Sequence, residues 1–119
     1  MNIYQEQIKQ FCEERGWNQF HNPKDLLLGI VEEVGELRNV VKWEQNPETL
    51  RKVLLENNEE VKDAVGDIFW FLSILANSCD VDIDEAIKMT IEDNEKRFPI
   101  EKTKDKHTNT YLGGHDGKY

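Results

Sequence analysis

Two glutamates at helical spacing are the first residues of this sequence that could do chemistry. Glu33 and Glu36 lie three positions apart, a spacing that on an α-helix sets Cβ atoms about 5–6 Å apart on one face. At roughly 100° per residue the same arc contains Ile30 and Leu37, whereas Arg38 falls on the opposite side. The spacing therefore predicts that two carboxylates point toward a core and can share one ligand.

A second acidic stretch repeats this pattern. Glu60, Asp63 and Asp67 occupy an arc of about 60° on a helix, and the arc continues into Phe71 and Ile74. Carboxylates on an apolar face cost on the order of several kcal/mol each unless their charge is compensated. We expect a divalent cation to supply that compensation.

The type of ligand narrows the choice of metal. Carboxylates with no His or Cys at ligand spacing favour Mg²⁺, with Mn²⁺ as the alternative, over zinc or copper. A di-iron bundle would need Glu-x-x-His pairs, which the sequence lacks. Magnesium held by a few carboxylates keeps water and substrate phosphates as its other ligands, which suits hydrolysis of a phosphoanhydride.

Two simpler explanations of the acidic residues stay open. Paired glutamates on a helix often belong to a solvated face, although the repetition on two apolar arcs favours a shared site. The acids could also pair with Lys and Arg across the interface of a helical interaction module. That second explanation predicts no stabilisation by magnesium.

Helical stretches are expected to position these acids, and nothing in the sequence alternates as strands do. The expected stretches run from Asn2 to Gly16, from Asn22-Pro23 to about Trp43, from the region 48–55 with a continuation over 59–77, and from Asp82 to Phe98-Pro99. Residues 17–21 are expected to form a loop. The pattern predicts an all-α, four-helix-bundle-like domain.

Length and charge limit the class of protein. With 119 residues and 38% hydrophobic content, we expect one domain with a modest core. A net charge of −9 argues against a nucleic-acid partner, because few cations would contact phosphates. No signal peptide or membrane-spanning stretch is evident, which favours the cytoplasm and no membrane partner. Cys12 and Cys79 are expected to be reduced and buried.

Four segments of the sequence form a recognisable set: residues 20–23 (FHNP), 32–37 (EEVGEL), 67–72 (DIFWFL) and 94–99 (NEKRFP). Together they resemble the MazG-like all-α nucleotide pyrophosphohydrolases, in particular the dCTP pyrophosphatase branch. It covers roughly residues 3 to 99, so a MazG-like domain is expected over 1–100. Residues 101–119 are expected to form a flexible, basic, glycine-containing tail.

The resemblance also implies roles for individual residues. Glu33, Glu36 and Asp67 match magnesium ligands, whereas Trp17, Trp43 and Phe71 match aromatics that stack on the base. The positions that line the nucleotide pocket or face its phosphates are His21, Asn94, Lys96 and Arg97. For Phe71 packing in the core is an equal alternative, and His21 could simply be a satisfied loop histidine.

One position departs from the family pattern. The glutamate usually found three residues before Asp67 is Ala64 in this sequence. Asp63 or Glu60 could replace it, directly or through water, because both lie on the same helical face; Asp63 is favoured. If neither does, the chain could be a regulatory nucleotide-binding domain without turnover.

The resulting hypothesis is Mg²⁺-dependent cleavage of a nucleoside triphosphate to the monophosphate and pyrophosphate. Glu32 or Glu36 would orient or deprotonate the attacking water. The resemblance suggests dCTP or a modified pyrimidine deoxynucleotide as substrate, with clearance of noncanonical nucleotides as the role. So small a bundle should also expose an apolar face, so we expect a homodimer or homotetramer.

Overall fold

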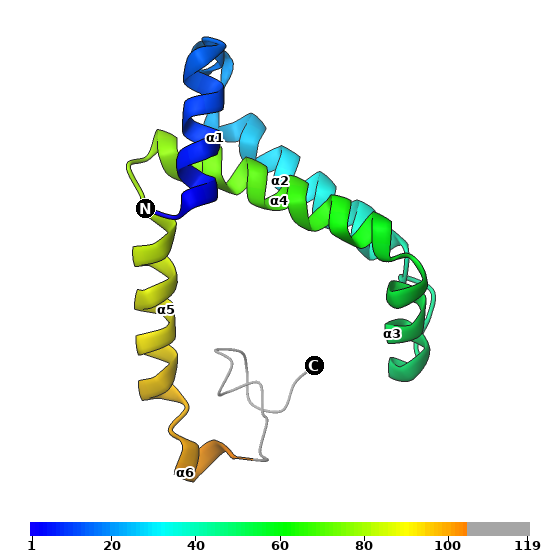
Figure 1. The fold of residues 1–119 in the computed structure, drawn as a ribbon. Helices are drawn as coiled ribbons and strands as arrows, with labels where there is room; N and C mark the ends of the chain where they lie inside the picture. The colour runs from blue at the N-terminus through cyan, green and yellow to red at the C-terminus, as the bar shows by residue number, and fades with distance from the viewer. Residues whose placement is uncertain (105–119) are drawn as a thin grey trace. The chain divides into compact units, whose positions relative to one another are not determined.

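The computed structural model describes residues 1–104, and every regular element in that range is helical (Figure 1). The elements are α1 (Ile3–Glu14), the 3₁₀ helix η1 (Trp17–Phe20), α2 (Pro23–Asn39), α3 (Pro47–Glu56), α4 (Asn58–Ser78), α5 (Ile83–Arg97) and α6 (Ile100–Thr103). The prediction of an all-α fold is therefore confirmed.

Three of the helices begin at asparagine caps. The Oδ1 atom of Asn2 accepts from the backbone N–H of Tyr4 at 2.9 Å and of Gln5 at 3.2 Å. Asn22 and Asn46 cap α2 and α3 in the same way, each followed by a proline that cannot donate a backbone hydrogen bond. These starts are encoded locally, which is why the first two were predictable.

The structure differs from the prediction at three places. Residues 17–20 form η1 rather than a loop, after Gly16 turns the chain with a φ of 62°. Helix α2 ends at Asn39 instead of Trp43, because Val40 and Val41 donate to carbonyls three residues back and tighten the chain into turns. Asn57 separates α3 from α4, within the interruption that was expected between residues 55 and 59.

The third difference is at the end of the described chain. Residues 100–103 form α6, which the Thr103 hydroxyl supports by donating to the Pro99 carbonyl at 2.8 Å. The expected tail thus begins within α6, and its residues 105–119 lie outside the described part of the chain.

The core lies where α1, α2 and α4 meet. Helices α2 and α4 run side by side, and α1 packs against α4 (Figure 1). Cys12, Leu26 and Ile74 form the buried centre, with partly buried apolar side chains around them. Burial raises the pKa of the Cys12 thiol, which keeps it protonated. Cys79 is exposed because it follows the last turn of α4, so its predicted burial is wrong.

The chain divides into two compact units, Met1–Ile83 and Asp84–Tyr119. The first unit contains α1, η1, α2, α3 and α4, which include both acidic stretches. The described part of the second unit contains nearly all of α5 and the short α6. This division lies before the domain boundary predicted at residue 100.

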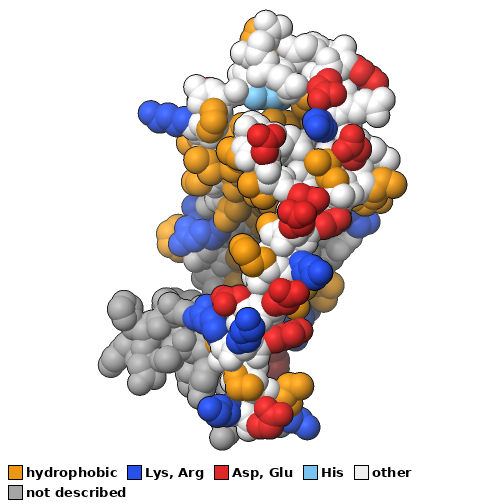
Figure 2. Space-filling view, turned by 90° about the vertical axis from the view of Figure 1, so that its left-hand side faces the viewer, with side chains coloured by type: hydrophobic (Ala, Val, Ile, Leu, Met, Phe, Trp, Pro, Cys, Tyr) orange, Lys and Arg blue, Asp and Glu red, His pale blue; other side chains and the backbone are white. Residues whose placement is uncertain are grey.

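Apolar side chains remain at the surface of α2. Leu27, Leu28, Val31 and Val34 are 49–66% exposed, and their spacing places them on one stripe. On the face drawn in Figure 2, hydrophobic side chains lie at the surface among charged ones of both signs. In residues 1–104 no single helix is long and apolar enough to cross a membrane; only α4 and α5 taken together reach that length and hydropathy.

Candidate active site

The two acidic stretches meet at a cavity between α2 and α4. The cavity has a volume of about 210 Å³. Its lining residues are Glu33, Glu36, Leu37 and Val40 from α2, and Glu60, Asp63 and Ala64 from α4. The helices run in opposite directions, which brings the last turns of α2 beside the first turns of α4. The helical spacing predicted this meeting.

Glu33 lies at the electrostatic centre of this group. The pKa of its carboxyl is raised above the ordinary value, first by burial and then by the negative charges of four neighbouring carboxylates. In order of effect these are Glu36, Asp67, Asp63 and Glu32. The structure therefore brings together acids from both helices around one partly buried glutamate.

Asp63 and Glu60 differ in their relation to Glu33. Both line the cavity, but only the charge of Asp63 contributes to the raised pKa of Glu33. Ala64 is 7% exposed and contributes a methyl group, not an oxygen, to the cavity wall. Asp63 directly precedes Ala64, the position of the missing ligand. Of the two α4 acids that line the cavity, it is the one whose charge raises the pKa of Glu33.

The donor set suits a hard divalent cation, because it consists of carboxylate oxygens alone. As they stand, no three Asp, Glu, His or Cys side chains within residues 1–104 converge closely enough to hold a metal ion. Glu36, Glu60 and Asp63 are exposed, so their carboxylates can turn toward Glu33 by side-chain rotation. Carboxylate oxygens are suitable ligands for magnesium. To surround the cation, the exposed carboxylates must first rotate toward Glu33.

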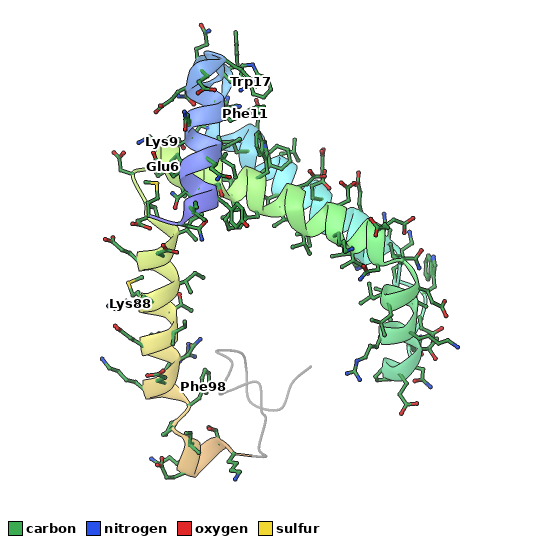
Figure 3. All side chains as sticks on the ribbon, viewed as in Figure 1. Glu6, Lys9, Phe11, Trp17, Lys88 and Phe98 are labelled. Atoms are coloured by element: carbon green, nitrogen blue, oxygen red, sulfur yellow. The ribbon has the colours of Figure 1, made fainter. Side chains whose placement is uncertain are left out.

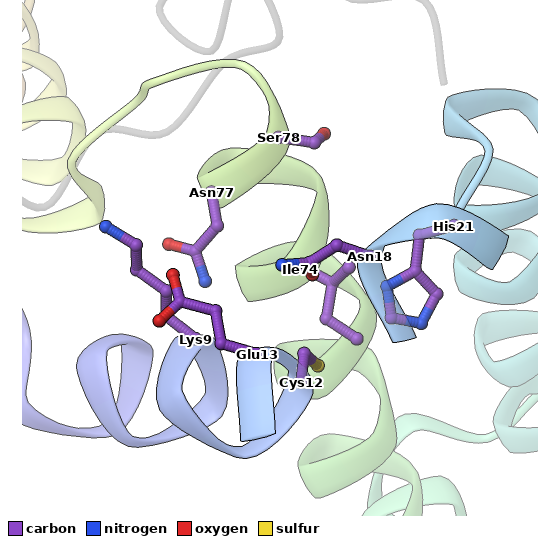
Figure 4. A pocket seen from close by; sticks show the side chains of 8 residues that line it. All are labelled: Lys9, Cys12, Glu13, Asn18, His21, Ile74, Asn77 and Ser78. Atoms are coloured by element: carbon purple, nitrogen blue, oxygen red, sulfur yellow. The ribbon is translucent and has the colours of Figure 1, made fainter. Parts of the chain in front are cut away.

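His21 lies in another cavity, of about 250 Å³, that shares no lining residue with the carboxylate cavity. Figure 4 shows this cavity between α1, the η1 segment and α4. Cys12 and Ile74 line it together with polar side chains that include Lys9 and Glu13. The Nδ1 atom of His21 is buried without a hydrogen-bond partner. This cavity was not predictable from the sequence, because its lining comes from three separate elements.

Trp17 belongs to an aromatic cluster at the end of α1. Its ring meets that of Phe11 edge to face, with centroids 5.4 Å apart. Figure 3 labels both residues. The Phe11 ring meets that of Trp70 in the same way, with centroids 5.2 Å apart. Trp17 is still 40% exposed, so part of its ring faces solvent. The clustering of Phe11 and Trp70 with Trp17 was not foreseen, because the three come from different elements.

The other two aromatic candidates have very different surroundings. Trp43 is 86% exposed, and the Lys42 ammonium lies 5.2 Å from its ring centroid. Phe71 packs against the buried core, and its ring lies against Gly29 of α2. Trp43 therefore keeps a face open to a ligand, whereas at least one face of Phe71 is taken up by packing.

The remaining candidates lie near the end of α5. Asn94, Lys96 and Arg97 are exposed in the described part of the second unit, and the Arg97 guanidinium lies 5.2 Å from the centroid of the Phe98 ring. Their part in nucleotide binding stays a prediction, as does that of His21. The sequence placed them on a helix, and the structure agrees with that.

Comparison with known proteins identifies the fold and family. The chain is 34% identical over 92 residues to bovine dCTP pyrophosphatase 1 and 33% identical over 91 residues to the human protein of that name. Each match covers 76% of this chain and 54% of the relative, so the chain spans about half the length of these curated relatives.

A solved structure gives the same assignment. A pyrophosphatase from Archaeoglobus fulgidus DSM 4304 superposes with a TM-score of 0.71 at 30% identity, over 79% of this chain and 87% of that one. The model of the MazG-like family matches residues 30–111, which include both acidic stretches. The chain belongs to the MazG-like family.

Proposed function

We propose that this chain hydrolyses a nucleoside triphosphate to the nucleoside monophosphate and pyrophosphate. The observation that carries the proposal is the group of acids from α2 and α4 around Glu33, at a cavity large enough for a cation and phosphate oxygens. Such a group would repel a triphosphate unless a cation intervened. The names of the bovine, human and archaeal relatives agree with this chemistry.

Magnesium is the proposed cofactor, with manganese as the alternative. Glu33, Glu36 and Asp67 are the proposed ligands, and Asp63 is preferred to Glu60 for the fourth position because its charge acts on Glu33. When bound, Mg²⁺ neutralises charge on the triphosphate and polarises the phosphorus under attack. The opposing acids of α2 and α4 then have a common counter-ion, which removes their mutual repulsion.

The chain's own residues supply the proton transfer. Glu32 and Glu36 are exposed at the edge of the acidic group, where a carboxylate oxygen can accept a proton from the attacking water. Lys96 and Arg97 are the proposed contacts for substrate phosphates, and Asn94 for the nucleotide. Attack at the α-phosphorus yields the two proposed products.

A pyrimidine deoxynucleotide, dCTP or a modified form, is the proposed substrate. The support is the name of the mammalian relatives and the aromatic side chains that keep open faces, Trp17 and Trp43. Removal of noncanonical nucleotides from the nucleotide pool is the proposed role.

A homo-oligomer, either a dimer or a tetramer, is the proposed assembly. The apolar stripe of α2, formed by Leu27, Leu28, Val31 and Val34, lies on the side of the helix opposite the acids. A second copy of the chain could cover it through the same surface on both subunits.

A second candidate function is nucleotide binding without turnover. Ala64 favours it, since a buried methyl group stands where the family pattern has a carboxylate. A cation held by fewer ligands could still bind a nucleotide but would position the reacting phosphate less well.

Pyrophosphate release from a panel of canonical and modified nucleoside triphosphates, with and without Mg²⁺, tests the proposal. Glu36→Gln should lower the rate by roughly 10²–10⁴-fold, the range for loss of a general base. Glu14→Gln, an exposed acid on α1, is the matched control and should keep the wild-type rate. Nucleotide binding with no pyrophosphate from any substrate would instead support the second function.

A further inference from the structure

Phe11 is the shared member of the aromatic cluster at the end of α1. Its ring meets the Trp17 ring at an interplanar angle of 75° and the Trp70 ring at 81°, so both contacts are edge to face. The Arg15 guanidinium lies over the Phe11 ring, 3.5 Å from its centroid, and Arg15 Nη1 donates to the Phe11 carbonyl at 3.1 Å. Through this ring Phe11 links α1 to η1 on one side and to α4 on the other.

Trp17 lies in a segment that is fixed mainly through its backbone. It is the first residue of η1, a short helix with no buried residue and no side-chain cap. Gly16 turns the chain just before it, and Gln19 Nε2 donates to the Gly16 carbonyl at 2.9 Å. These features hold the turn but not the indole. Within residues 1–104, the contact with Phe11 is the ring contact that orients Trp17.

The aromatic cluster adjoins the acidic group on α4. Trp70 lies three residues after Asp67, a proposed metal ligand, and this spacing sets their Cβ atoms about 5–6 Å apart on one face of the helix. The acids of α2 and α4 and all the cluster residues belong to the first compact unit. Phosphates held at the acids would therefore place the rest of a nucleotide next to a surface that carries aromatic rings.

We propose that Phe11 is a positioning residue for the nucleobase, acting through Trp17. The inference rests on the proposed function, in which the open part of the Trp17 ring stacks on the base. Trp17 is 40% exposed, so its ring can meet a base while it rests against Phe11. A ring that is already oriented loses less rotational freedom when the base binds, which favours binding. Phe11 itself contacts neither the base nor the phosphates.

The test compares Phe11→Leu with Phe69→Leu. Both residues line the same apolar cavity of about 470 Å³ between α1 and α4, but in the described residues only Phe11 makes a ring contact with Trp17. Phe11→Leu should raise KM for dCTP about fivefold, the size expected for loss of an aromatic pair, and leave kcat at saturation near wild type. The inhibition constant of inorganic tripolyphosphate, which has no base, should stay constant. Phe69→Leu should change none of these.

A double-mutant cycle separates this role from a general loss of packing. Trp17→Ala removes the proposed stacking ring, so Phe11→Leu should have no further effect on KM in that background. Phe11→Tyr keeps the ring and should keep the wild-type KM. If Phe11→Leu folds poorly, Phe11→Met takes its place in the cycle, because methionine fills irregular core space and still removes the ring.

A readout that needs no activity accompanies the kinetics. In protein labelled with fluorotryptophan, the fluorine resonance of Trp17 is identified by its loss in Trp17→Ala. Phe11→Leu should move this resonance toward that of a solvent-exposed indole, because the ring loses the contact that orients it. Phe69→Leu should leave it in place.

The outcomes separate the two proposals. A folded Phe11→Leu variant with wild-type KM for dCTP, an equal rise in the tripolyphosphate constant, or full additivity with Trp17→Ala overturns the positioning role. Wild-type protein that cleaves no nucleotide of the panel overturns the proposed function. Binding of dCTP with Mg²⁺, measured by calorimetry, then replaces KM in the same comparison, and an absence of binding overturns the positioning role as well.

Discussion

Gly29 on α2 and Phe71 on α4 pack so closely that a β-carbon on residue 29 would crowd the Phe71 ring. A Cβ built on Gly29 would lie 3.1 Å from Cζ of the Phe71 ring. The glycine therefore allows α2 and α4 to approach with the ring between them, one turn away from the acids that line the cavity. The spacing of the two helices at this contact sets how far apart Glu33 and Asp67 can be.

Gly29→Val should destabilise the protein by about 1–3 kcal/mol, because the branched side chain must displace a packed ring. Urea denaturation, followed by circular dichroism, measures the change. Gly35→Ala on the same helix is the matched control, since nothing lies within 4 Å of its added Cβ. It should instead stabilise by about 0.5–1 kcal/mol, the usual gain over glycine in a helix. Equal effects at both positions would show that close packing at Gly29 is unimportant.

The sequence alone could predict features that depend on neighbouring residues. Helical period and caps depend on neighbouring residues, so two features were predictable: the helices that begin after Asn2 and Asn22, and the placement of Glu33 and Glu36 on one face of α2. The inward direction predicted for Glu36 is wrong, because its side chain is exposed. The end of α2 was not, because Val40, Val41 and Trp43 continue an apolar pattern and no glycine or proline marks the stop before Pro47.

Contacts between segments that are far apart in the chain could not be predicted from the sequence. Nothing in the order of residues indicates that Gln5 reaches Ile83, or that Phe11, Trp17 and Trp70 form one cluster. The preference for Asp63 over Glu60 was a choice between residues on one face, and the contribution of Asp63 to the raised pKa of Glu33 adds a physical reason for it.

The raised pKa of Glu33 predicts a pH-dependent stability in the absence of divalent cations. The folded protein holds the Glu33 proton to higher pH than the unfolded chain does, so stability falls as pH rises from about 4.5, the ordinary value, through the raised folded pKa. Glu33→Gln removes this loss. At pH 7 in EDTA the variant should have a higher Tm than wild type, and the difference should vanish below pH 4.

Differential scanning calorimetry at a series of pH values from acidic to neutral, in EDTA, measures the effect. Glu14→Gln, far from the acidic group in sequence and exposed, serves as the control. A wild type that is more stable than Glu33→Gln at neutral pH without cations would contradict the electrostatic account.

Magnesium should bind less tightly after loss of Asp63 than after loss of Glu60. Both side chains line the cavity, but only Asp63 acts on Glu33. We expect Asp63→Asn to weaken Mg²⁺ binding roughly tenfold, or about 1.4 kcal/mol, and Glu60→Gln to have a smaller effect. Isothermal titration calorimetry without nucleotide measures both. Ala64→Glu should strengthen binding, and the reverse order of the two losses would favour Glu60 as the replacement ligand.

The stripe of exposed apolar residues on α2 gives the last prediction. Val31 is 66% exposed in the middle of that stripe, so a charge there should cost little in the isolated subunit but oppose burial against a second copy. Val31→Lys should therefore shift the protein to monomers in sedimentation velocity. Leu55→Lys on α3 changes a side chain that is also 66% exposed but lies outside the stripe, and it should leave the assembly intact. If the wild type is a monomer, or if both variants dissociate alike, the stripe is not the subunit interface. If only Val31→Lys dissociates, the face of α2 opposite the acids holds the subunits together.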